Sequence, residues 1–167
     1  MVYSDDHGKN WQLSESITPG CNESTVAELS DSRLMMNMRN YNGKKCRAVS
    51  TSSDGGETWS PVIQDENLIE PRCQASLISC DRGDEHLMIF SNPDSTRHRE
   101  KMTVRVSKDD GKTWPIAKQL HAGPSAYSCL TVLPNGDIGC FYEFGVKKGD
   151  SYKAIVFEVV SIESLLK

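Results

Sequence analysis

The chain has 167 residues and a formal net charge of −4, from 19 Lys and Arg against 23 Asp and Glu. This length suits one domain or part of one, and the scattered charges form no basic stripe of the kind that binds nucleic acid. No apolar run approaches the roughly 18 residues that a membrane span needs, and no signal-peptide hydrophobic region follows Met1. Composition therefore favours a globular domain and excludes nucleic acid and a membrane span as partners.

In chain order, the sequence predicts short strands separated by turns. The first complete unit has strands at 24–29, 34–40, 46–52 and 61–64, with turns at Asp31-Ser32 and Asn42-Gly43. The second unit has strands at 75–79, 86–91, 102–107 and 116–120. A third has strands at 129–133, 138–144 and 153–159, and the only helical signal is a short tail at 161–166.

One turn motif occurs three times. Residues 4–11, 52–59 and 107–114 share the form Ser-x-Asp-x-Gly-x-(Thr/Asn)-Trp. Ser and Asp can bond the turn amides, Gly supplies a positive φ, and Trp can pack beneath the turn. We therefore interpret the motif as a structural hairpin turn and assign its aspartates no catalytic role. Its fixed positions are Ser4, Asp6, Gly8 and Trp11, then Ser52, Asp54, Gly56 and Trp59, then Ser107, Asp109, Gly111 and Trp114.

Four antiparallel strands in a repeat of about 50 residues are typical of a β-propeller blade. We therefore predict an all-β fold, a partial β-propeller with about two complete blades. The expected parts are a partial blade at 1–13, blades at about 20–66 and 73–121, a last blade at about 127–160, and the tail helix. Because propellers usually close with at least four blades, we expect further blades of the same domain outside this sequence.

The cysteines give no sign of a metal site. They form no C-x-x-C pair and have no histidine at ligand spacing, so we predict no metal and no cofactor. Several lie inside apolar strand-like runs, which favours free buried thiols over a disulfide framework and leaves the cellular compartment open. The six residues are Cys21, Cys46, Cys73, Cys80, Cys129 and Cys140.

The repeated turn resembles the Asp box of sialidases (neuraminidases), and the segments between the turns extend the resemblance. Residues 20–29, 34–41, 90–93 with Arg99 downstream, and 123–130 look like the active-site segments of bacterial-type exo-α-sialidases, in the same order and at similar spacing. The resemblance implies the later blades of a six-bladed domain and a retaining glycosidase that releases terminal sialic acid from sialylated glycans. The localisation stays unknown from this sequence, and a full-length protein that is secreted or periplasmic is compatible with the resemblance.

The same resemblance implies roles for four residues. Tyr127 matches the nucleophile, and Glu23 matches the glutamate that polarises it. Arg39 and Arg99 match the second and third arginines that bind the sialic acid carboxylate. The family's first arginine and its aspartate acid/base have no counterpart in this sequence. We therefore expect the isolated chain to hydrolyse sialosides far more slowly than a complete sialidase.

The strand pattern supports this grouping. In an antiparallel blade, the start of strand one, the end of strand two and the loop into strand three lie at one end, which would gather these four residues on one rim. The Asp boxes join strands three and four and would lie at the opposite end. A neutral phenol suits a sialoside, because its anomeric carbon carries a carboxylate that would repel a carboxylate nucleophile. A phenol needs a base at neutral pH, and Glu23 would accept its proton.

Several alternatives stay open at this point. Arg97 stands two residues from Arg99 and could replace it, and Glu28 is the alternative to Glu23. Glu143 and Arg72 are candidates for the rim of the pocket. Asp boxes also occur in propellers without catalytic activity, so the alternative function is a non-catalytic module that binds sialic acid or another carbohydrate.

Overall fold

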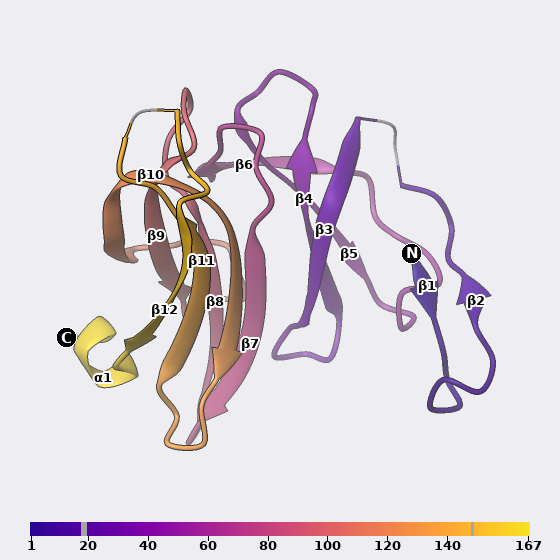
Figure 1. The fold of residues 1–167 in the computed structure, drawn as a ribbon. Coiled ribbons are helices and arrows are strands. Elements are labelled where there is room, and N and C mark those ends of the chain that lie inside the picture. Colours follow the sequence, from indigo (N-terminus) through magenta and orange to yellow (C-terminus); the bar gives the residue numbers. More distant parts are fainter. Residues whose placement is uncertain (18–19, 148) are drawn as a thin grey trace.

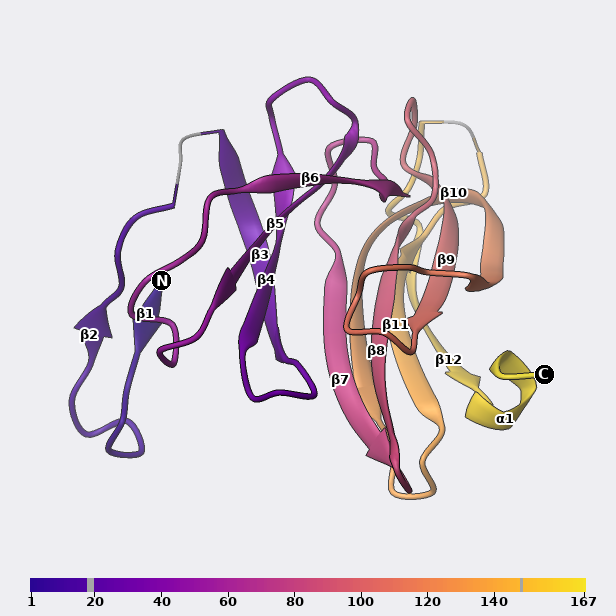
Figure 2. The same ribbon diagram turned by 180° about the vertical axis from the view of Figure 1, so that it is seen from behind.

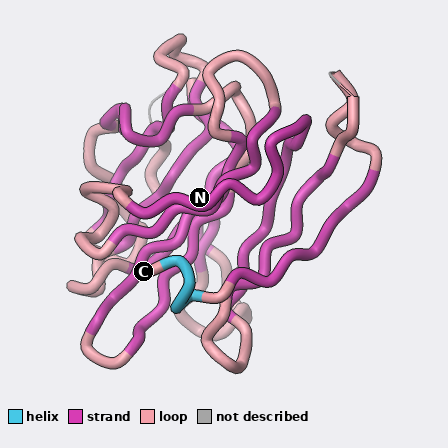
Figure 3. The backbone as a smooth tube through the Cα atoms, turned by 90° about the vertical axis from the view of Figure 1, so that its left-hand side faces the viewer, coloured by secondary structure: helices cyan, strands magenta, loops and turns pink. Residues whose placement is uncertain are grey.

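The computed structural model describes residues 1–17, 20–147 and 149–167. Within these ranges the chain is built of antiparallel sheets and one short helix (Figures 1 and 3). A two-stranded sheet pairs β1 (Val2–Tyr3) with β2 (Gln12–Leu13). A four-stranded sheet contains, in spatial order, β3 (Cys21–Glu28), β4 (Leu34–Asn40), β5 (Cys46–Ser52) and β6 (Ile63–Ile69).

The remaining strands form one six-stranded sheet. It contains β7 (Ser76–Arg82), β8 (Glu85–Pro93), β9 (Glu100–Ser107), β10 (Ile116–Val132), β11 (Ile138–Phe144) and β12 (Ala154–Val160), in sequential spatial order. The helix α1 (Ile162–Leu165) follows and is capped by the Ser161 hydroxyl, which accepts from the Ser164 amide. No helix in the described ranges has the length and apolar character that crossing a bilayer requires.

The strand β10 differs from the sequence prediction of two separate strands at 116–120 and 129–133. It is continuous, pairing with β9 from Ile116 to Pro124 and with β11 from Ser125 to Val132. Register shifts between Gln119 and His121, and again before Pro124, bend the strand without ending it. One strand therefore passes from the edge of one four-stranded group to the inner position of the next.

Some strand limits also differ from the sequence predictions. The strand β6 covers Ile63–Ile69 rather than 61–64, because a register shift between Cys46 and Arg47 lets the pairing with β5 resume at Ile69. The polar run from Asp65 to Asn67 gave no strand signal. The last element is shorter than predicted and spans four residues.

The sheets stack face to face, and their core lies in the layers between them (Figures 1 and 2). One layer packs residues of β3 to β6 against residues of β7 and β8, with Leu68, Leu77, Met88 and Phe90 fully buried. The next layer lies between the two halves of the six-stranded sheet and includes Ile89, Val104 and Ile138. Each layer buries large apolar side chains, and burial of apolar surface stabilises a fold by roughly 25 cal/mol per Å². The stacking of the sheets is therefore the main source of stability.

The inner strands β3, β7 and β10 lie side by side, as required for a site that spans three sheets. The Thr25 hydroxyl donates to the Leu77 carbonyl (3.2 Å). The Leu130 amide donates to the Ser76 hydroxyl (3.0 Å). These bonds connect β3 to β7 and β7 to β10, and they fix the positions from which residues on β3 and β10 meet.

The Asp boxes are closed by their own side chains. In the third box, the Ser107 hydroxyl accepts from the Gly111 amide (2.9 Å) and donates to Asp109, whose carboxylate accepts from the Thr113 amide (2.9 Å). The Ser30 hydroxyl donates to Asp110 (2.6 Å), so this box packs on the turn between β3 and β4. That turn is at the opposite end of β3 and β4 from Glu23 and Arg39.

Side-chain burial differs between the Asp boxes, and the expectation of buried thiols was wrong for one cysteine. Trp11 is 65% exposed, because no further strand of the described chain covers the two-stranded sheet, whereas Trp114 is 6% exposed in the core. Cys129 is also exposed, since it points outward from β10 next to the buried Leu130. Burial holds for Cys46, Cys73 and Cys140, while Cys21 and Cys80 are half-buried; all six thiols are free in the described chain.

Candidate active site

Three of the predicted site residues meet at one end of the inner strands. Glu23 lies near the start of β3, Arg39 near the end of β4, and Tyr127 on β10. The Tyr127 hydroxyl donates to Glu23 Oε1, and Arg39 Nη1 donates to Glu23 Oε2 (2.5 Å) and to the Tyr127 oxygen (3.2 Å). Residues 104 positions apart in the sequence therefore form one hydrogen-bonded group.

The protonation states in this group follow from its contacts. Burial raises the pKa of Glu23, but the hydrogen bonds from Tyr127 and Arg39 outweigh it and hold the pKa below its ordinary value. The hydrogen bond to Glu23, together with burial, raises the pKa of Tyr127 above its ordinary value. At neutral pH the group therefore contains a neutral phenol donating to an ionised carboxylate, with the Arg39 cation beside both.

Arg99 approaches the same group from the loop before β9. Its guanidinium carbon lies 5.5 Å from the centroid of the Tyr127 ring. Arg99 Nη1 donates to the Tyr152 hydroxyl (2.7 Å), and Nη2 donates to the Arg72 carbonyl (3.2 Å). The structure thus brings a second cation to the tyrosine.

Of the remaining candidates, two contact the group and two lie away from it. The Glu143 carboxylate accepts from the Tyr127 amide (2.9 Å), so Glu143 contacts the backbone of the site. Arg72 is exposed, and its carbonyl holds Arg99. Arg97 is exposed and lines a neighbouring cavity, so it does not take the place of Arg99 beside Tyr127. Glu28 is exposed at the far end of β3, where its carbonyl oxygen contacts His86 (3.1 Å), so it does not join the group.

Comparison with known proteins places the chain among propeller repeats. The BNR repeat-like domain matches residues 1–140. The chain belongs to the BNR repeat-like domain family. It is 39% identical to a sialidase of Micromonospora viridifaciens over 86% of this chain and 23% of that protein. It is 34% identical to a sialidase of Bacteroides fragilis over 100% of this chain and 31% of that protein.

Solved sialidases share the fold of this BNR repeat domain. The Hadza microbial sialidase Hz136 superimposes with a TM-score of 0.86 at 35% identity, over 98% of this chain and 32% of that one. The antiparallel sheets are thus blades of a sialidase-type propeller. The chain spans only 23% of the length of the Micromonospora viridifaciens sialidase and 31% of that of the Bacteroides fragilis sialidase.

Sequence reasoning missed a buried ion pair beneath the site of this sialidase homologue. Arg47 Nη1 donates to Glu70 Oε2 (2.5 Å) and to the Cys73 carbonyl (2.7 Å), and both charged side chains are 0% exposed. Glu70 Oε1 accepts from the Asn40 amide (2.7 Å), next to Arg39. An arginine within the otherwise uncharged strand run Cys46–Ser52 was the available signal.

Two aromatic residues beside the site were also missed. The Tyr41 ring lies 4.9 Å from the Arg39 guanidinium carbon and 5.8 Å from that of Arg72. Tyr152 reaches Arg99 from the segment after β11. Tyr41 follows Arg39 by two residues at the end of β4, and this spacing was the available signal for their contact. The contacts of Tyr41 with Arg72 and of Tyr152 with Arg99 join segments far apart in the sequence, so no spacing could reveal them.

Proposed function

We propose that this chain carries the nucleophile half of an exo-α-sialidase active site, a retaining glycosidase that releases terminal sialic acid from sialylated glycans. The observation that carries the proposal is the hydrogen-bonded group of Tyr127, Glu23 and Arg39, with Arg99 against the tyrosine ring. A surface tyrosine has no need of an ionised carboxylate and two arginines, whereas a phenol nucleophile needs both a base and an anion-binding partner.

The proposed reaction has two steps. In the first, the Tyr127 proton moves to Glu23 while the phenol oxygen attacks the anomeric carbon, and the bond to the leaving oxygen breaks with its electron pair on that oxygen. The leaving oxygen becomes an alcohol by taking a proton from a general acid outside this sequence. In the second, the conjugate base of that acid takes a proton from the water that attacks the same carbon. The bond to Tyr127 breaks with its electron pair on the phenol oxygen, which takes its proton back from Glu23. Two displacements at one carbon retain its configuration. The raised pKa of Tyr127 means that the phenolate exists only as the proton moves to Glu23.

The two arginines suit the carboxylate of the sugar. Arginine presents paired donors in a planar fork that matches a carboxylate. In the free protein Arg39 is bonded to Glu23 and Tyr127, and Arg99 to Tyr152 and the Arg72 carbonyl. A bound carboxylate would take donors from these partners and at the same time draw the anomeric carbon toward Tyr127.

The alternative is a module that binds sialic acid without cleaving it. Both functions use Arg39 and Arg99, but only catalysis needs a proton acceptor for Tyr127. The bond from Tyr127 to an ionised Glu23 therefore favours the enzyme.

Covalent trapping with a 3-fluorosialosyl fluoride tests the proposal. Fluoride leaves without a general acid, so labelling depends on the nucleophile, base and arginines of this chain. We expect intact-mass spectrometry to find one fluorosialyl group per chain, and peptide mapping to place it on Tyr127. Tyr127→Phe should abolish the label, and Glu23→Gln should slow labelling by about 10²–10⁴-fold.

The matched control is Tyr152→Phe, which also removes a phenol hydroxyl beside an arginine. It should leave the label on Tyr127. Saturable sialoside binding with no label on the unmodified chain would refute the enzyme and support the binding module. A label on any other residue would refute the role of Tyr127.

A further inference from the structure

A cavity with basic side chains lies beside the candidate active site. It has a volume of about 340 Å³, in the range of small-ligand pockets. We call it the basic cavity; it is lined by Lys45, Glu70, Pro71, Arg72, Thr96, Arg97 and His98.

The cations of this cavity are not neutralised by neighbouring acids. Within the described ranges, Lys45, Arg72 and Arg97 take part in no salt bridge. The one acid in the lining, Glu70, is 0% exposed and paired with Arg47. Three exposed cations thus share one cavity in a chain whose net charge is −4, which gives the cavity a local potential suited to an anion.

Hydrogen bonds fix the main chain around the basic cavity. Lys45 and Arg72 have φ of 55° and 57°, a left-handed conformation that is unfavourable for residues with long side chains and concentrates at functional sites. The Glu70 amide donates to the Lys45 carbonyl (2.9 Å). The Ser95 hydroxyl accepts from the amides of Arg97 (3.2 Å) and His98 (3.3 Å). The main-chain positions that carry the cations are therefore set before a ligand binds.

The basic cavity is continuous with the surroundings of Arg99. The Arg72 carbonyl accepts from Arg99, and the Tyr41 ring contacts both Arg72 and Arg39. His98 lines the basic cavity and also the adjoining cavity of about 730 Å³ that contains Arg99 and Tyr152. The basic cavity therefore adjoins the cavity that contains Arg99.

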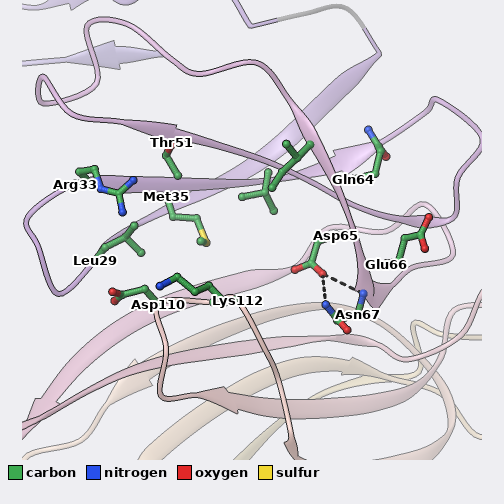
Figure 4. A pocket seen from close by; sticks show the side chains of 13 residues that line it. Leu29, Arg33, Met35, Thr51, Gln64, Asp65, Glu66, Asn67, Asp110 and Lys112 are labelled. Carbon is green, nitrogen blue, oxygen red and sulfur yellow. Dashed lines mark hydrogen bonds between the residues drawn. The ribbon is translucent and has the colours of Figure 1, made fainter.

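A cavity elsewhere in the structure is lined by side chains of both charges. Figure 4 shows a cavity of about 520 Å³ with acidic Asp65 and Glu66 at one side and Asp110 beside the basic residues Arg33 and Lys112 at the other. The mixed signs select no ligand class, which is why the basic cavity carries the inference.

We propose that the basic cavity binds an anionic group, a sulfate ester or a second carboxylate, on the sugar next to the sialic acid. The enzyme or binding module would then prefer glycans that are charged beyond the terminal residue. This inference rests on the proposed function for the position of the sialic acid, while anion binding by the cavity is measured separately.

The first experiment measures binding to the cavity itself. Amide chemical shifts of the 167-residue chain are followed by NMR during titration with galactose 6-sulfate and, as the neutral probe, galactose. We expect changes at residues 45, 72, 97 and 98 with the sulfated sugar alone. These should disappear in Lys45→Asn/Arg97→Gln, where asparagine accepts the left-handed φ. The control Lys9→Gln/Lys118→Gln removes the same charge at exposed sites elsewhere and should keep them.

The second experiment compares three sialosides by calorimetric dissociation constants: a sialyl-lactose whose only charge is the sialic acid carboxylate, its 6-sulfated derivative and an α2,8-linked disialoside. We expect one of the two glycans with a second anionic group to bind at least about fivefold more tightly than sialyl-lactose at 50 mM salt. At 1 M salt, where the screening length is about 3 Å, the dissociation constants should be equal. The arm with the gain identifies the source as sulfate or carboxylate.

Equal dissociation constants for all three glycans would overturn the inference, as would a preference that survives in Lys45→Asn/Arg97→Gln. A chain that binds no sialoside, yet binds galactose 6-sulfate through Lys45 and Arg97, would refute the proposed function while leaving the anion-binding cavity in place. The two failures are therefore distinguishable.

Discussion

The pair of Arg47 and Glu70 gives the sharpest test of how this fold supports its site. Both side chains are 0% exposed, and Arg47 also holds the Cys73 carbonyl, while Glu70 holds the Asn40 amide. Glu70→Gln would keep an acceptor for the amide but leave the Arg47 charge buried without a counter-ion. Removing one partner of a buried pair costs about 3–5 kcal/mol. Because glutamine keeps one oxygen, we expect about 3 kcal/mol.

Urea unfolding followed by circular dichroism measures this loss. For a chain of this size each kcal/mol shifts Tm by about 2–4 °C, so Glu70→Gln should lower Tm by about 6–12 °C. The exposed pair of Arg33 and Asp31, which has a similar separation (2.8 Å), is the control. Arg33→Gln should cost less than about 1 kcal/mol.

A double variant separates charge burial from packing. In Arg47→Met/Glu70→Leu no charge of this pair remains buried. The loss in unfolding free energy should therefore be at least about 2 kcal/mol smaller than the sum of the losses in Arg47→Met and in Glu70→Leu. The reasoning would be refuted if Glu70→Gln cost no more than Arg33→Gln, or if the two losses at Arg47 and Glu70 simply added.

Three further predictions concern pH, the Asp boxes and the core. In the proposed sialidase reaction, kcat/KM would require ionised Glu23 and neutral Tyr127; since the pKa of Glu23 is lowered and that of Tyr127 raised, these two groups should lower kcat/KM only below about pH 4.3 and above about pH 10, and an acid limb above pH 6 would contradict this. Hydrogen bonds from the Thr58 side chain and amide and from Ser52 lower the pKa of Asp54 to about 2, so its stabilising contribution is present above about pH 4 and is lost as the pH falls through 2. Asp54→Asn should therefore lower Tm at pH 7 but not at pH 2, whereas Asp84→Asn at an exposed turn should change Tm little at either pH. Phe90→Ala should cost about 3–5 kcal/mol in urea unfolding, because Phe90 is 0% exposed and packs on a tryptophan ring; a cost below 1 kcal/mol would mean that the layer repacks.

Local patterns in the sequence determined the repeating elements of this protein. The Asp boxes could be read because each is closed by residues within eight positions, through side-chain bonds such as those of Ser107 and Asp109. The strands β4, β5 and β11 were predicted with their observed limits, since turn residues bound each of them. A motif of local bonds carries its own structure, so no tertiary information was needed there.

The grouping of Glu23, Arg39 and Tyr127 was only partly within reach of the sequence. Strand order and a resemblance to sialidases placed them at one end of the fold, but the bonds between them depend on how β3 and β10 lie on either side of β7. The continuous β10, the buried pair of Arg47 and Glu70, and the contacts of Tyr41 and Tyr152 were decided by tertiary structure alone. A buried charge or a bend in a strand depends on partners far away in the chain, and the residue pattern of a single strand does not identify those partners.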